Sequence, residues 1–120
     1  MRTIRVGLGD RAYDILIENT ILASIGADLK QRGIAKRYVV VADSHVGELL
    51  GPKLMASLAA AGVSAELITF PRGEASKHLA TVAELASRLA QLGLDRKDAL
   101  IALGGGVTGD ITGFLAAIYM

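Results

Sequence analysis

Three short apolar runs alternate with longer segments of helical periodicity along most of the 120-residue chain. The runs are RYVVVAD (37–43), SAELITF (64–70) and DALIAL (98–103). Helical spacing of apolar residues marks segments 19–33, 46–62, 76–93 and 108–120. Strands connected through helices form a parallel sheet with helices packed on its faces. We therefore predict an α/β fold, with a Rossmann-like parallel sheet, as one domain over residues 1–120.

Local signals refine this outline. TIRV (3–6) and YDILI (13–17) flank a turn-rich segment, which predicts an N-terminal β-hairpin. Thr20 is a suitable N-cap for the first helix and Gly33 a suitable stop. Pro52 is expected to break the second helix or to begin a new first turn there. The inner faces are predicted to comprise Val46, Leu50, Leu54 and Leu58 in the second helix, and Leu79, Val82, Ala86, Leu89 and Ala90 in the third.

Composition excludes several classes of function. Thirteen basic and twelve acidic residues nearly cancel, so nucleic acid and anionic membrane are not expected partners. No apolar segment approaches the length of a membrane span, and no signal peptide is evident. With no cysteine in the chain, disulfides and thiolate metal sites are excluded within these residues. The lack of cysteine fits a reducing compartment, and we expect a cytoplasmic protein.

A glycine-rich loop follows the last apolar run. Gly104, Gly106 and Gly109 satisfy the pattern GxGxxG between a predicted strand and a predicted helix. Glycines there let the backbone approach a pyrophosphate, whose charge then faces the helix N-terminus. A tight turn with glycine only for packing is the equally weighted alternative. The sequence GK[ST] is absent, which excludes a Walker-type loop.

Four charged residues lie where the predicted strands end and helices begin. Asp43 ends the first strand and is either a ribose acceptor or the N-cap of the next helix. Asp110 falls in the first turn of the last predicted helix, where the dipole favours an acid whatever its function. Glu74 and Lys77, three residues apart, form either a helix-surface pair or a contact to sugar hydroxyls and phosphate. The two histidines show no metal-ligand spacing and are expected to be partly exposed at helix starts.

Two longer strings carry a family resemblance. FPRGEASKHLATVAEL and LIALGGGVTGDITGFLAAIYM resemble the N-terminal part of the 3-dehydroquinate synthases, which are sugar-phosphate cyclases. The resemblance covers essentially the whole chain but only about a third of a family member. It implies NAD and a divalent metal, zinc or cobalt, as cofactors. It also implies conversion of 3-deoxy-D-arabino-heptulosonate 7-phosphate to 3-dehydroquinate and phosphate in the shikimate pathway.

Carried over position by position, the resemblance implies a set of cofactor-binding residues. Asp43 would bind the adenosine ribose, the glycine loop the pyrophosphate, and Asp110 the ribose near the nicotinamide. The full set is Asp43, Gly73, Glu74, Lys77, Gly105, Gly106, Val107, Thr108, Gly109 and Asp110. No catalytic residue and no metal ligand is assigned within the chain, because the family carries them in a helical C-terminal domain. The chain is thus expected to be an inactive piece of a longer, homodimeric enzyme acting on a small sugar phosphate.

Two alternatives remain open. The first is a related cyclase that makes an inosose or a valiolone from another sugar phosphate, because cofactor contacts are shared across these enzymes. The second is a stand-alone nucleotide-binding module without catalytic activity.

Overall fold

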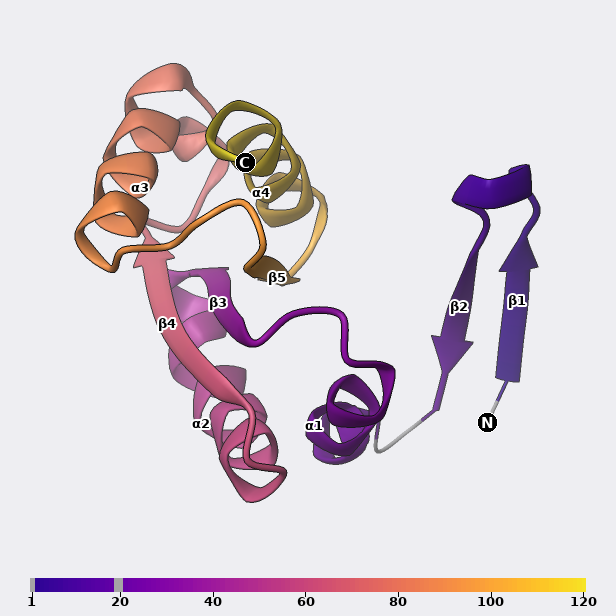
Figure 1. The fold of residues 1–120 in the computed structure, drawn as a ribbon. Coiled ribbons are helices and arrows are strands. Elements are labelled where there is room, and N and C mark those ends of the chain that lie inside the picture. The colour runs from indigo at the N-terminus through magenta and orange to yellow at the C-terminus, as the bar shows by residue number, and fades with distance from the viewer. Residues whose placement is uncertain (1, 19–20) are drawn as a thin grey trace.

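The computed structural model describes residues 2–18 and 21–120, with only the backbone of Glu74. An N-terminal hairpin precedes a body in which strands and helices alternate (Figure 1). The elements are β1 Arg2–Val6, η1 Gly9–Arg11, β2 Tyr13–Ile17, α1 Ile21–Arg32, β3 Arg37–Asp43, α2 Ser44–Ala60, β4 Ser64–Phe70, η2 Glu74–Ser76, α3 Leu79–Gln91, β5 Ala99–Leu103 and α4 Gly106–Tyr119. The predicted N-cap Thr20 lies outside the described residues.

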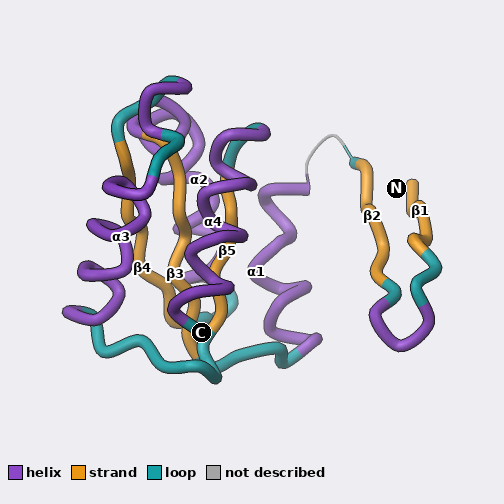
Figure 2. The backbone as a smooth tube through the Cα atoms, turned by 90° about the horizontal axis from the view of Figure 1, so that it is seen from above, coloured by secondary structure: helices purple, strands orange, loops and turns teal. Residues whose placement is uncertain are grey.

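The body is a three-stranded parallel sheet in the order β4-β3-β5. In the central strand, Val40 lies opposite Leu67 on one side and Ile101 on the other. Helices α1 and α2 pack on one face and α3 and α4 on the other, as the view from above shows (Figure 2). The predicted α/β fold is confirmed, and so is the N-terminal hairpin, in which β1 pairs antiparallel with β2.

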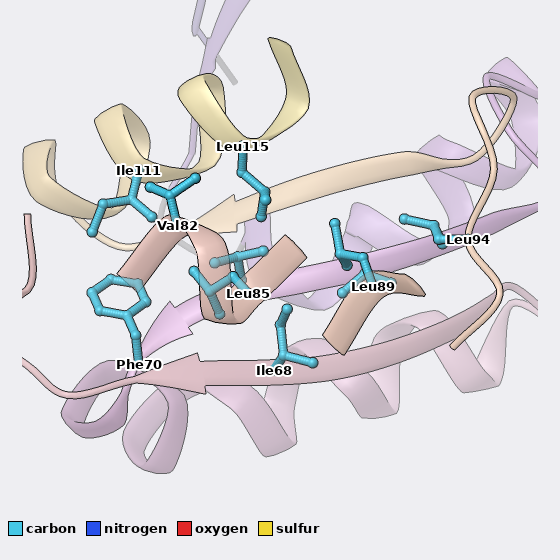
Figure 3. Packing of buried hydrophobic residues seen from close by; sticks show 10 residues of the cluster. Ile68, Phe70, Val82, Leu85, Leu89, Leu94, Ile111 and Leu115 are labelled. Carbon is cyan, nitrogen blue, oxygen red and sulfur yellow. The ribbon is translucent and has the colours of Figure 1, made fainter. Parts of the chain in front are cut away.

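The core forms on both faces of β3. Its residues from Tyr38 to Ala42 are at most 2% exposed, as expected for a central parallel strand covered on both sides. Val39 and Val41 point into the layer shared with α3 and α4, where Phe70, Leu85 and Leu115 also pack (Figure 3). Val40 and Ala42 contribute to the opposite layer. Among the described residues, no helix is long and apolar enough to cross a membrane.

Two helix predictions are wrong in detail. Helix α2 runs without a break through Pro52. A residue before proline normally avoids the helical region because its Cβ crowds the ring, and Gly51 has no Cβ. In α3, Leu79 is 71% exposed whereas Leu85 is 1% exposed, so the buried face is rotated from the predicted one. Ala90 and, on α2, Leu50 are likewise exposed.

Helices α1 and α2 approach each other closely at Gly26. A Cβ on this residue would lie 2.0 Å from the Ser57 carbonyl oxygen, so no larger residue fits. The Gly26 N–H donates to Ser57 Oγ at 3.0 Å, and that hydroxyl donates to the carbonyl of Ala23 at 3.1 Å. The contact fixes how α1 lies on the sheet.

An ionic brace holds the amino ends of the strands. Arg37 at the start of β3 donates to Asp98 Oδ2 at 3.1 Å and to the Leu92 carbonyl at 3.0 Å. The same Asp98 oxygen accepts the backbone N–H of Asp95 at 3.0 Å. That backbone hydrogen bond and the Arg37 guanidinium together outweigh desolvation and lower the pKa of Asp98 below its ordinary value. The brace lies at the end of the sheet opposite the segments considered next.

Candidate functional site

The segments that follow the three body strands meet at one edge of the sheet. Because β3, β4 and β5 are parallel, their carboxyl ends point the same way, and ligands of such sheets bind there. Two polar contacts connect these segments. The Arg72 N–H donates to Ser44 Oγ at 3.2 Å, and Lys77 Nζ pairs with Asp110 Oδ2 at 2.8 Å. The structure therefore brings the predicted site residues to a common edge.

The glycines of the loop after β5 are not equivalent. Gly104 has a φ of +151°, and a Cβ there would lie 2.7 Å from Thr108 Oγ1. Glycine is therefore required at 104 by the fold itself. At Gly105 and Gly106, by contrast, a Cβ would meet nothing within 4 Å. The alternative that glycine serves only for packing therefore explains Gly104. It does not explain Gly105 and Gly106, because none of the described residues would clash with a side chain there.

Helix α4 begins directly behind these open glycines. Gly105 is the N-cap and provides no side chain to accept from the helix amides. The first helical bond runs from the Gly109 N–H to the Gly105 carbonyl at 3.0 Å, so the amides before it have no partner within the helix. Thr108 is 1% exposed and Val107 packs against the core, so neither side chain is available to a ligand. A helix start with backbone amides that lack partners within the helix suits an anion.

Asp43 serves as the N-cap of α2. Its Oδ1 accepts the Val46 N–H at 2.7 Å, as the capping alternative predicted. The second oxygen, Oδ2, accepts no hydrogen bond from the residues that the structure describes. Capping and ligand binding are therefore compatible, because a carboxylate has two oxygens and the cap uses one.

Lys77 and Asp110 come from different elements and form an ion pair. Helix α4 starts at Gly106, two residues earlier than predicted, so Asp110 lies beyond its first turn and the expected dipole contribution of this acid is wrong. The predicted Glu74–Lys77 pair involves a Glu74 side chain outside the described part of the structure. Gly73 precedes that short turn with a φ of +113°, which explains glycine by backbone conformation alone.

A pocket of about 260 Å³ adjoins the ion pair between α3 and α4. Its apolar side includes Phe114 and Leu79, both well exposed. Residue-by-residue reasoning did not assign either to the site. Phe114 follows Asp110 by four residues, which places both on one face of a helix. This spacing is the sequence signal that could have assigned Phe114 to the site.

No metal centre is found in the parts of the chain that the structure describes, where no group of three histidine, aspartate or glutamate residues could hold an ion. His45 and His78 are exposed near the starts of α2 and α3, as predicted. Within the described residues there is thus no site for a divalent metal.

Comparison with known proteins shows that the chain is similar to 3-dehydroquinate synthases. The family model described as "3-dehydroquinate synthase N-terminal" matches residues 67–120. The 3-dehydroquinate synthase of Caulobacter vibrioides is 48% identical over 120 residues, covering 99% of this chain and 32% of the relative. That of Lactococcus lactis subsp. cremoris strain MG1363 is 44% identical over 117 residues, covering 98% and 33%. The chain thus spans about a third of the length of these relatives.

Solved structures agree on the fold. A 2-deoxy-scyllo-inosose synthase complexed with carbaglucose-6-phosphate, NAD+ and Co2+ matches with a TM-score of 0.85 and 26% identity, over 98% of this chain and 32% of that one. ValA, a 2-epi-5-epi-valiolone synthase from Streptomyces hygroscopicus subsp. jinggangensis 5008 with NAD+ and Zn2+ bound, matches with a TM-score of 0.76 and 30% identity, over 95% and 31%.

Proposed function

We propose that the chain is an N-terminal part of a protein of the 3-dehydroquinate synthase family and that it binds NAD at the carboxyl edge of its sheet. The observation that carries this proposal is the open start of α4. Gly105 and Gly106 leave room where a Cβ would meet nothing within 4 Å, directly in front of unpartnered helix amides. Such a cradle fits a pyrophosphate.

Each predicted residue has a distinct task in this proposal. The backbone amides of Gly106, Val107 and Thr108 bind the pyrophosphate oxygens. Asp43 accepts a ribose hydroxyl through the carboxylate oxygen that the α2 cap leaves free. Asp110, held by Lys77, presents a second carboxylate beside the pocket. Gly73, Glu74 and Gly109 complete the proposed contact set by family resemblance. When bound, NAD supplies reversible hydride transfer.

For the whole protein we propose the activity of the named relatives, 3-dehydroquinate synthase, with 3-deoxy-D-arabino-heptulosonate 7-phosphate as substrate. Elimination and aldol chemistry need acid–base groups and a metal. The described residues contain no metal cluster, so we assign the divalent metal and the catalytic groups to a further domain. Residues 1–120 alone, as an N-terminal dinucleotide-binding domain, are expected to release no phosphate from this substrate.

A related cyclase activity is the second candidate, supported by the inosose and valiolone synthases among the structural neighbours. Identity favours the first candidate. The chain shares 48% and 44% of residues with 3-dehydroquinate synthases, against 26% and 30% with the two other cyclases. A small-molecule sugar phosphate is the proposed partner in either case. We further propose a homodimer in the cytoplasm, without nucleic acid or membrane partners.

A chimera tests the proposed activity without knowledge of any further sequence. Residues 1–120 replace the matching third of the Caulobacter vibrioides enzyme, and phosphate release is measured. A second chimera joins residues 1–120 to the remainder of the 2-deoxy-scyllo-inosose synthase. We expect the first chimera to turn over its substrate faster than the second, each relative to its parent. A folded first chimera that binds NAD yet shows no turnover would contradict the assignment.

A further inference from the structure

The segment that connects β4 to α3 contains one buried hydroxyl group in exposed surroundings. We call residues 71–77, which leave the carboxyl end of β4, the strap. Ser76 is 6% exposed, whereas the other strap residues are exposed, apart from Glu74, whose side chain lies outside the described part of the structure. Burying a hydroxyl group costs free energy unless it forms a hydrogen bond. A buried serine at this position therefore needs a physical reason.

Two serine hydroxyl groups hold the strap in its shape. The Ser76 hydroxyl donates to the Pro71 carbonyl, five residues earlier, and so closes the strap on itself. The Ser76 N–H donates to the Gly73 carbonyl at 3.1 Å within the same turn. The Arg72 N–H donates to Ser44 Oγ at 3.2 Å, which ties the strap to the start of α2. The strap is thus anchored both within itself and to a neighbouring element.

Lys77 is the strap residue that reaches the proposed site. Its Nζ lies 2.8 Å from Asp110 Oδ2, and both residues line the pocket between α3 and α4. Their side chains are 45% and 62% exposed, and so open an ion pair adds little stability, because ordering two side chains offsets the attraction. Stability alone therefore does not account for the pair. Its formation depends on where the backbone places Lys77, and Ser76 directly precedes that residue.

We propose that Ser76, which is not in the predicted contact set, is a positioning residue of the nucleotide site. Its hydrogen bond to Pro71 holds the strap in the shape that brings Lys77 to Asp110 beside the pocket. Because the Ser76 side chain is buried, it acts through Lys77 and not on the nucleotide itself. A strap that is already ordered costs less entropy when a ligand binds. The inference rests on the NAD binding proposed above and adds a residue to that site.

NMR relaxation of the ¹⁵N-labelled 120-residue chain, free of nucleotide, tests the positioning step. Ser76→Ala removes the hydroxyl group with little change in size. Ser57→Ala is the matched control, because Ser57 also donates to a backbone carbonyl, that of Ala23, in the contact between α1 and α2. We expect the backbone order parameters of residues 72–77 to fall in Ser76→Ala only, toward the value of about 0.6 that marks flexible backbone. Unchanged order in the strap, or an equal loss there in Ser57→Ala, would overturn the proposal.

A double-mutant cycle on NAD affinity tests whether Ser76 acts through Lys77. In titrations followed by amide shifts, Ser76→Ala should raise the Kd about threefold to tenfold, and Ser57→Ala should leave it unchanged. Lys77→Gln should also raise the Kd, and adding Ser76→Ala to it should then change the Kd by less than about twofold. Additive effects, or an unchanged Kd in folded Ser76→Ala, would refute the positioning role and leave NAD binding intact. Failure of the unaltered chain to bind NAD would instead refute the proposed function, and this inference with it.

Discussion

Gly106→Asp separates the binding role of the glycine loop from its role in the fold. Position 106 is the first residue of α4 and is exposed, and a Cβ there would meet nothing within 4 Å. The substituted carboxylate therefore fits without displacing the protein. It would, however, lie in front of the amides proposed to bind pyrophosphate, where it repels phosphate and occupies the same space.

We expect Gly106→Asp to raise the stability of the fold and to weaken NAD binding. For stability, replacing glycine contributes a few tenths of a kcal/mol, and an acid in the first turn adds about 0.3–1 kcal/mol through the helix dipole. The free energy of unfolding should then rise by about 0.5–1 kcal/mol. For binding, like charges about 4 Å apart cost between about 1 kcal/mol in water and about 4 kcal/mol near a protein surface. NAD affinity should fall at least about fivefold.

Calorimetric titration with NAD and thermal unfolding measure both quantities on one preparation. Because residues 1–120 provide only part of a binding cleft, we expect a Kd of about 1 mM for the unaltered chain. Gly113→Asp is the control, since it adds the same charge to the same helix about 10 Å further along, where salt screens it. The control should bind NAD normally. If Gly106→Asp is folded and binds NAD as well as the control does, the loop is not the nucleotide site.

Substitutions at three further positions test other parts of the structure. Asp43→Asn keeps a good N-cap, so the free energy of unfolding should change by less than about 0.5 kcal/mol while NAD binding weakens. Asp43→Ala should weaken NAD binding and also lower the free energy of unfolding by about 1 kcal/mol. If calorimetry finds equal NAD binding by the unaltered chain and both variants, Asp43 does not bind the ribose. Because its pKa is lowered on folding, Asp98 contributes stability that is complete above its ordinary value of 3.8 and is lost as the pH falls through the folded value. Urea titrations at successive pH values should therefore show Asp98→Asn losing less stability than the unaltered chain below about pH 4, and parallel losses would argue against the brace. Gly26→Ala should lower the free energy of unfolding by about 2–3 kcal/mol, since its Cβ would lie 2.0 Å from the Ser57 carbonyl; a melting temperature equal to that of the unaltered chain would contradict this packing.

The sheet was readable from the sequence because its central strand is covered on both faces. Such a strand is a continuous apolar run, and RYVVVAD coincides with β3 from Arg37 to Asp43. Helix faces were less readable. In α3 the many alanines are compatible with more than one orientation of the helix about its axis. The sequence pattern therefore predicts Leu79 on the buried face and does not single out Leu85, whereas in the structure Leu79 is exposed and Leu85 is buried. The unbroken helix at Pro52 was also not predicted, because the prediction from proline alone ignores that Gly51 has no Cβ to clash with the ring.

The location of the site could be predicted from the sequence, but the contacts between its residues could not. Parallel strands dictate that Asp43, the segment after β4 and the glycine loop share an edge, and they do. The pairing of Lys77 with Asp110 was not predictable, because it joins residues from elements that only the packing of α3 against α4 brings together. The distinction between a required Gly104 and an unconstrained Gly106 likewise depends on where the Thr108 side chain packs.

The most direct test of NAD binding at the carboxyl edge is an NMR titration of the ¹⁵N-labelled chain with NAD. We predict that the amide signals of Gly106, Val107 and Thr108 shift most, with those of Asp43 and Lys77 also moving, while signals around Arg37 and Asp98 at the opposite end of the sheet stay in place. Saturable shifts confined to the Arg37 end, or no shifts at NAD concentrations well above about 1 mM, would contradict the account.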